Sequence, residues 1–310
     1  MSAPAAAALA GTSGSTTRLA LRRFRRNPVA TVSVAVLAVL VLSAIFAPAI
    51  EALLGPGASE VDLLNRFAGP SAAHPLGTDE LGRDLLVRLL YGGRVSLMVG
   101  LTAAGAAAVI GTVLGILAGY YGGRLDALLM RLTDGVISLP LLPLLIVLAA
   151  IDLSKLGLPA AWVASEDVSL YRIVVLIALV GWTTVARLAR GATLAVRQRE
   201  FVRAAVALGA RNRRVMWVHV LPNVVSPIIV ATTLSVGNVI LLESVLSFLG
   251  LGIQPPIPSW GNMLTNAQEL IWTTPALAVW PGLMIFATVI AFNFIGDGLQ
   301  DAFNPKSRIH

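Results

Sequence analysis

Two long apolar segments are separated by Glu200-Phe201-Val202-Arg203-Ala204-Ala205-Val206-Ala207-Leu208-Gly209, which leads through an arginine-rich region to Leu221-Pro222-Asn223. The run of small residues predicts a short amphipathic helix, which Gly209 would end in a left-handed conformation. Pro222 would mark the return of the chain toward the second apolar segment. The predicted apolar face of the helix comprises Phe201, Val202, Ala205 and Leu208. The stretch therefore predicts a soluble docking module carried by a membrane protein.

The composition independently indicates a membrane protein. Hydrophobic residues make up 56% of the 310 residues and charged residues 13%, whereas roughly a quarter of a soluble domain is charged. The net charge of +7 would suit nucleic acid only if basic residues shared an exposed face with base-reading or stacking groups. Here the arginines flank apolar segments instead. Cysteine is absent, which excludes disulfides and thiolate metal sites.

Six apolar stretches predict an all-α membrane protein with six transmembrane helices, since about 20 apolar residues cross a bilayer. The third stretch carries Pro140 and Pro143, and it and the fourth are short, so four or five spans is the alternative. The first exceeds the apolar run of about 7–15 residues in a signal peptide and is read as a retained anchor. The stretches lie near residues 29–50, 95–121, 132–151, 170–186, 224–242 and 275–295.

The distribution of basic residues predicts the orientation, because short cytoplasmic loops retain Lys and Arg. The segment 243–275 has no basic residue and should face outward. Both termini are therefore predicted to be cytoplasmic. The basic residues on the cytoplasmic side would be Arg18, Arg22, Arg23, Arg25 and Arg26, then Arg124 and Arg131, then the arginines from Arg187 to Arg214, and finally Lys306 and Arg308.

The chain divides into a cytoplasmic tail, a membrane domain and a short second tail. The N-terminal tail is predicted to be disordered to about residue 17, because it lacks apolar periodicity. The basic run that follows, at 22–26, fits acidic lipid headgroups, a partner, or simply a topological anchor. The predicted bounds are 1–27 for the first tail, 28–303 for the membrane domain with external loop 51–94 and cytoplasmic loop 187–222, and 304–310 for the second tail.

The external loop contains His74-Pro75-Leu76-Gly77-Thr78-Asp79-Glu80-Leu81-Gly82-Arg83-Asp84. Thr78 or Asp79 is a plausible N-cap and Gly92-Gly93 a stop, which predicts a short helix lying against the outer mouth. A metal site built from the histidine and the acids is the alternative. Because helix capping already accounts for the acids, no metal is predicted.

The outward loop after the fifth span is rich in Pro and Gly and contains Trp260. Its apolar residues predict a segment tucked into the outer mouth. Three interpretations are weighed equally: a contact for a binding protein, a gate, and a scaffold packed on the last span. The polar residues expected to border a pathway are Asn238, Glu243, Asn293 and Asp297, with helix-end hydrogen bonding as the alternative for the last two.

Five motifs, taken in order, resemble the C-type permease subunit of the dipeptide/oligopeptide ABC importer family. They occupy residues 74–97, 119–123, 200–209, 247–264 and 296–299, and the similarity extends over nearly the whole chain. The resemblance implies the type I permease architecture with a cytoplasmic coupling helix, in a bacterial cytoplasmic membrane. It implies a second homologous permease as heterodimer partner, two ATP-binding subunits and an extracytoplasmic binding protein. The expected cargo is a di- or oligopeptide; relatives take nickel complexes or glutathione.

The resemblance also implies site residues. In the family's pattern an acid precedes the paired alanines, where this chain has Arg203, with Glu200 one turn earlier. The ATPase-coupling residues would be Glu200, Phe201, Arg203, Ala204, Ala205, Leu208, Gly209, Leu221 and Pro222. The residues that would dock the binding protein are Asp79, Glu80, Arg83, Asp84, Gln254 and Trp260.

The sequence contains no nucleotide-binding or catalytic motif. A phosphate-binding loop needs a Lys after its final Gly, but Lys155 follows Ser154 and Lys306 follows Pro305. ATP and Mg²⁺ would thus be bound by partner subunits, with no cofactor on this chain. An intramembrane metalloprotease is excluded because His-Glu-x-x-His is absent. The remaining alternative of a different class is an ion-coupled secondary transporter.

Overall fold

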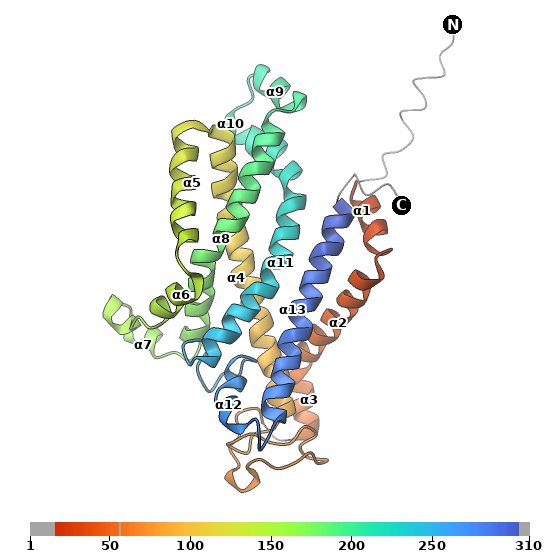
Figure 1. Cartoon of the computed structure of the whole chain (residues 1–310), viewed down its shortest axis with the longest axis vertical. Coiled ribbons are helices and arrows are strands. Elements are labelled where there is room, and N and C mark those ends of the chain that lie inside the picture. The colour runs from red at the N-terminus through yellow and green to blue at the C-terminus, as the bar shows by residue number, and fades with distance from the viewer. Residues whose placement is uncertain (1–15, 56, 304–310) are drawn as a thin grey trace.

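The computed structural model describes residues 16–55 and 57–303, which are helical apart from turns and connecting loops (Figure 1). The predicted tails therefore lie largely outside the described residues. In the described part of the N-terminal tail, Thr16–Phe24 is helical. The α-helices are α1 Thr16–Phe24, α2 Pro28–Ile45, α3 Ala47–Leu54, α4 Leu85–Tyr121, α5 Gly123–Ser138, α6 Leu141–Ala149, α7 Ala160–Val163, α8 Val168–Arg197, α9 Glu200–Ala207, α10 Asn212–Arg214, α11 Leu221–Phe248, α12 Ala267–Leu270 and α13 Ala276–Phe303. The π-helical segment Val215–Val220 joins α10 to α11.

Five of these helices are long and apolar enough to cross a membrane, and a sixth crossing exists if one bent pair is a single span. The five long helices confirm the predicted all-α membrane fold. The predicted third span is not a straight helix, because α5 and α6 meet at 86°. The break falls at Leu139, whose backbone is extended (φ −82°, ψ 138°). The proline that follows disfavours the helical conformation at Leu139 and supplies no N–H for a continuous helix.

Helix α4 lies at the centre of the molecule, beside α8 and α11 (Figure 1). Its contact with α8 depends on glycines at every fourth position, where an added β-carbon would lie 2.5–2.8 Å from a backbone carbonyl of α8. Small residues at this spacing allow two helix backbones to approach closely within a membrane. The pairs are Gly111 with Trp182, Gly115 with Ala186 and Gly119 with Arg190.

The start of α4 contradicts the predicted short external helix. Asp84 caps α4, its Oδ1 accepting a hydrogen bond from the Val87 amide at 2.8 Å. The helix then runs through Gly92-Gly93 without stopping. These glycines make room for a neighbour, because β-carbons there would lie 3.2–3.3 Å from Ser259, Trp260 and Met263 atoms at position 92, and 2.8 Å from the Trp260 ring at position 93. Tertiary packing therefore overrides the glycine stop signal.

The fifth span is also longer than predicted. Helix α11 continues to Phe248, so Glu243 belongs to the helix and not to the outward loop. The loop that follows is tucked inward: the Trp260 side chain is 2% exposed and joins the main hydrophobic core with Ile240, Leu246 and Ile173. This position favours the scaffold interpretation of the loop around Trp260. A second core, near α9, contains Val185, Val202, Val215 and Val224 among others.

Candidate functional site

Helix α9 projects from one end of the molecule, beyond the ends of α4 and α8 (Figure 1). Arg199 precedes it in an extended conformation, and Glu200 places an acid in the first turn, which is favourable at a helix N-terminus. The Gly209 amide donates to the Val206 carbonyl at 2.9 Å, and Gly209 has φ +82°. The predicted short helix, ended by Gly209 in the left-handed region, is confirmed.

The face that α9 presents outward differs from the predicted one. Val202 is 1% exposed and packs into the second core with Val215 and Val220. Phe201 and Leu208 remain outward, at 45% and 88% exposure. The prediction that Val202 belongs to the docking face is wrong, because this side chain attaches α9 to its own chain. The other predicted coupling residues on or beside α9, namely Glu200, Arg203, Ala204 and Gly209, are exposed, and Ala205 is half-buried.

The return to the membrane is a continuous helix. The chain is helical from Asn212 through the π-helical segment into α11, so the helix begins ten residues before Pro222 and Pro222 does not mark the return. Pro222 occupies an early position of α11 and is exposed, whereas Leu221 is half-buried against the second core. After a four-residue turn that follows α9, one continuous helix therefore runs from Asn212 into the membrane-spanning part of α11.

Several polar contacts at this end were not predicted from the sequence. The Tyr120 hydroxyl donates to Asn212 Oδ1 at 3.0 Å, which joins the end of α4 to α10. Arg190 donates to both carboxylate oxygens of Asp126, at 2.5 and 2.6 Å, and binds α8 to α5. Neither contact had a local signal in the sequence, because its partners are 92 and 64 residues apart, respectively.

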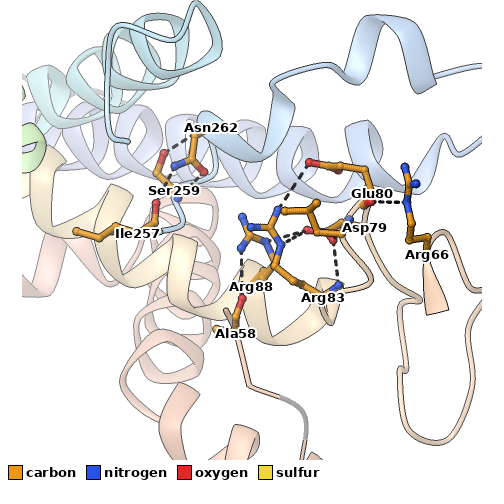
Figure 2. A network of polar contacts seen from close by, with 10 residues as sticks. Ala58, Arg66, Asp79, Glu80, Arg83, Arg88, Ile257, Ser259 and Asn262 are labelled. Carbon is orange, nitrogen blue, oxygen red and sulfur yellow. Dashed lines mark hydrogen bonds and ion pairs between the residues drawn. The ribbon is translucent and has the colours of Figure 1, made fainter. Parts of the chain in front are cut away.

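At the opposite end, a cleft of about 340 Å³ opens between the loop that precedes α4, the start of α4 and the segment that follows α11. Asp79 is buried at the side of this cleft. Its Oδ2 accepts a hydrogen bond from Arg83 Nε at 2.7 Å and lies 3.3 Å from Arg88 Nε (Figure 2). Arg88 also donates to the Ala58 carbonyl at 3.2 Å. Asp79 therefore holds the loop that precedes α4 onto that helix, while Glu80 is half-exposed at the cleft.

The remaining predicted docking residues divide into buried and exposed ones. Asp84 is fully buried, because it caps α4 and its Oδ2 lies 2.9 Å from His74 Nδ1. Trp260 is buried and its Nε1 donates to the Leu89 carbonyl at 3.0 Å. Gln254 is exposed and also lines the cleft. In residues 16–55 and 57–303, no group of three or more His, Cys, Asp or Glu side chains is arranged to hold a metal ion.

The predicted pathway residues do not form one cluster. Glu243 is fully buried and accepts from Ser96 of α4 at 3.1 Å and from Ser247 at 2.7 Å. The Ser96 hydroxyl also accepts from the Trp260 amide at 3.2 Å, so this network joins α4, α11 and the outer loop. Asn238, Asn293 and Asp297 lie elsewhere on α11 and α13: the first and last are exposed and Asn293 is half-buried.

Two carboxyl groups in loops outside the membrane-spanning helices have pKa values shifted by hydrogen bonds from neighbouring residues. The pKa of Asp62 is lowered because the Asn65 side chain and the Leu64 amide donate to its carboxylate. The pKa of Asp152 is lowered in the same way by the Ser154 hydroxyl and amide. Both carboxylates cap short 3₁₀ turns, so their hydrogen bonds order loops.

Sequence comparisons extend over nearly the entire chain. Residues 111–309 match the family described as binding-protein-dependent transport system inner membrane component, and residues 15–70 match the N-terminal TM domain of oligopeptide transport permease C. The chain is 40% identical over 291 residues to the dipeptide transport system permease protein DppC of Alkalihalophilus pseudofirmus. The aligned region covers 94% of this chain and 90% of the relative.

Two further relatives carry different names. The oligopeptide transport system permease protein OppC of Bacillus subtilis is 36% identical over 289 residues, 93% of this chain and 89% of the relative. The glutathione transport system permease protein GsiD of Pectobacterium atrosepticum is 39% identical over 285 residues, 92% of this chain and 89% of the relative. Relatives named for peptides and for glutathione are thus similar to this chain to a comparable degree.

Proposed function

Because this chain belongs to the family of inner membrane components of binding-protein-dependent transport systems, we propose that it is a permease subunit of an ATP-driven importer of di- or oligopeptides. As a member of this family it is a multi-pass transport permease and not an enzyme. The observation that carries the proposal is α9, a short helix with exposed apolar side chains, which buried Val202 attaches to one end of the membrane-spanning helices.

Helix α9 is proposed to dock into a groove on a partner ATPase. Phe201 and Leu208 supply outward apolar contacts, and Glu200 and Arg203 lie beside them as a polar rim. An amphipathic helix that enters a partner's groove in this way is a common recognition mode. Because Val202 anchors α9 to the second core, a displacement of α9 by the ATPase would be passed to α8 and α11. ATP and Mg²⁺ would be bound by the ATPase.

The remaining partners follow from the same assignment. Five or six spans would form half of a translocation pathway, and a second homologous permease would complete it as a heterodimer. The end that carries α9 would be cytoplasmic, which agrees with the basic residues of 187–214, and both termini are proposed to lie on the same side of the membrane. An extracytoplasmic binding protein would meet the opposite end, where Glu80 and Gln254 are accessible and Asp84 and Trp260 are not.

Glutathione is a second candidate cargo, because the GsiD relatives are 39–40% identical to this chain and DppC is 40% identical. Uptake by the reconstituted transporter separates the candidates. Radiolabelled dipeptide, pentapeptide and glutathione should be offered singly and in competition. Uptake of a peptide that excess glutathione leaves unchanged supports the peptide assignment; the reverse pattern would assign glutathione.

Co-purification tests the assembly itself. The chain, tagged and extracted in a gentle detergent, should bring down a second permease and ATP-binding subunits, identified by mass spectrometry. An F201A/L208A variant should retain the second permease and lose the ATPases, because only the α9 contact is altered. Recovery of the chain alone, under conditions that preserve a known transporter complex, would contradict the proposal.

A further inference from the structure

A basic and apolar surface precedes the first span, on α1 and the turn that follows it. The α1 surface is defined as Arg18, Leu19, Leu21, Arg22, Arg25 and Arg26, all of which are exposed. Leu19 and Leu21 are 47% and 52% exposed. The first acidic residue of the chain is Glu51, beyond α2. The charge of the α1 surface is therefore not balanced by any carboxylate nearby in the sequence.

Contacts with α13 fix the position of α1. Ala20 is 8% exposed, and the Phe24 ring lies so close to Gly298 that an added β-carbon there would be 3.1 Å from Phe24 Cε2. Asn27 then caps α2, accepting from the Ala30 amide at 3.1 Å. Figure 1 shows α1 beside the end of α13, at the end of the molecule that also carries α9. The α1 surface thus lies where α2 leaves the membrane.

Some arginines elsewhere in the chain already have a carboxylate partner. Arg83, Arg88, Arg187 and Arg190 each pair with a carboxylate. In the part of the chain that the structure describes, no ion pair or hydrogen bond is made by the side chains of the four α1-surface arginines. Their guanidinium groups are therefore available to an external anion.

We propose that the α1 surface binds the headgroups of anionic phospholipids. Guanidinium groups match phosphate oxygens with paired hydrogen bonds, and four or more basic side chains beside a span suit an anionic bilayer surface. A soluble polyanion would engage the charges but leave Leu19 and Leu21 in water, whereas at a bilayer they enter the acyl boundary as the headgroups meet the arginines. This inference depends on the membrane-spanning helices and not on the proposed cargo, so each can fail without the other.

The test uses the full-length chain in a mild neutral detergent. It is incubated with equal amounts of phosphatidylglycerol and phosphatidylcholine that have identical acyl chains, and bound lipid is counted by native mass spectrometry. The unchanged chain should prefer phosphatidylglycerol. The variant R18Q/R22Q/R25Q/R26Q should lower the ratio of the two bound lipids by about tenfold or more, since each basic side chain at an anionic surface contributes about fivefold.

A matched variant removes the same charge elsewhere. R124Q/R131Q/R213Q/R214Q alters four other exposed arginines, and it should keep the phosphatidylglycerol preference of the unchanged chain. An equal loss of preference in both variants, or an unchanged ratio in the α1 variant, would overturn the proposal. The lysine variant R18K/R22K/R25K/R26K, which keeps the charge, should restore most of the preference.

A third variant separates a lipid from a soluble phosphate. L19Q/L21Q keeps every charge that directs membrane insertion, and it should lower bound phosphatidylglycerol by roughly threefold because the apolar contact is lost. Inorganic phosphate at the headgroup concentration should not displace the lipid. Full displacement by phosphate, or unchanged lipid binding by L19Q/L21Q, would assign a soluble anion to the α1 surface and overturn the proposal.

Discussion

Trp260 occupies the space that a side chain at Gly93 would need: a β-carbon at position 93 would lie 2.8 Å from Trp260 Cζ2. The indole Nε1 donates to the carbonyl of Leu89, one helical turn earlier, at 3.0 Å. The loop that carries Trp260 is thus held on α4 by close packing and by a hydrogen bond. Glycine is required at position 93 because the indole leaves no room for a side chain.

Gly93→Ala is expected to lower the free energy of unfolding by about 1–3 kcal/mol, because the added methyl group overpacks against the indole. The measurement is thermal or denaturant unfolding of the purified chain. Gly105→Ala is the matched control in the same helix, since a β-carbon there meets nothing within 4 Å. It should leave stability unchanged or raise it by up to about 1 kcal/mol. Similar effects at both positions would contradict the role of Trp260.

Glu243→Ala is expected to lower the free energy of unfolding by about 1–3 kcal/mol, because the buried hydroxyls of Ser96 and Ser247 would lose their acceptor. Asn238→Ala, at an exposed position of the same helix, should change it by no more than about 0.5 kcal/mol. Unfolding of both variants in one detergent provides the comparison. Loss of transport in the glutamate variant with unchanged stability would instead assign Glu243 to the pathway.

Substitutions of Leu208 and Val202 should have different effects, the first on ATPase coupling and the second on the stability of the chain. Leu208→Gln alters an 88% exposed side chain and should lower substrate-stimulated ATP hydrolysis by about tenfold, as expected for a central interface contact. Val202→Ala, at 1% exposure, should instead destabilise the chain by about 2 kcal/mol through a cavity. Hydrolysis by the assembled transporter and melting of the isolated chain are both measured. Normal hydrolysis with Leu208→Gln would remove α9 from the ATPase interface.

Gly209→Ala should loosen the end of α9. The residue has φ +82° and open space around it, so a methyl group adds backbone strain of about 1–2 kcal/mol without a clash. Hydrogen exchange at the Gly209 amide, which bonds to Val206, should accelerate about fivefold or more. Gly191→Ala lies in α8 with the same open space and no positive φ, and it should leave this amide unchanged. Equal protection in both variants would exclude strain at Gly209.

Orientation can be tested in the naturally cysteine-free chain. Ser59 and Gln198 are exposed and lie in the external loop and at the end of α8. A membrane-impermeant maleimide should label S59C in intact cells, and should label Q198C only after permeabilisation. Labelling of Q198C from outside would reverse the proposed orientation. Ser259 is unsuitable as a probe because it is fully buried.

Local sequence signals predicted the elements that depend on few neighbours. Five of the predicted spans correspond to long helices, because a run of apolar residues needs no partner to favour a membrane. The end of α9 was equally predictable, since the left-handed cap is a property of Gly209 itself. Pro140 signalled a break in the third span, but the 86° angle between α5 and α6 also depends on how each helix packs against α8.

The candidate site was only partly predictable. The position of helix α9, the proposed docking helix, and the exposure of Phe201 and Leu208 followed from the sequence, whereas the inward direction of Val202 did not. An amphipathic helix of two turns carries apolar residues on more than one side, and only the second core decides which of them is buried.

The sequence by itself determined that this is a multi-span membrane protein with a basic segment between two spans, because hydropathy and charge act residue by residue. Tertiary structure decided which residues of its motifs are accessible. Asp84 and Trp260 became buried parts of the α4 junction, while Glu80 stayed half-exposed and Gln254 stayed exposed. Burial depends on contacts between segments far apart in the chain, and no local pattern of residue types contains that information.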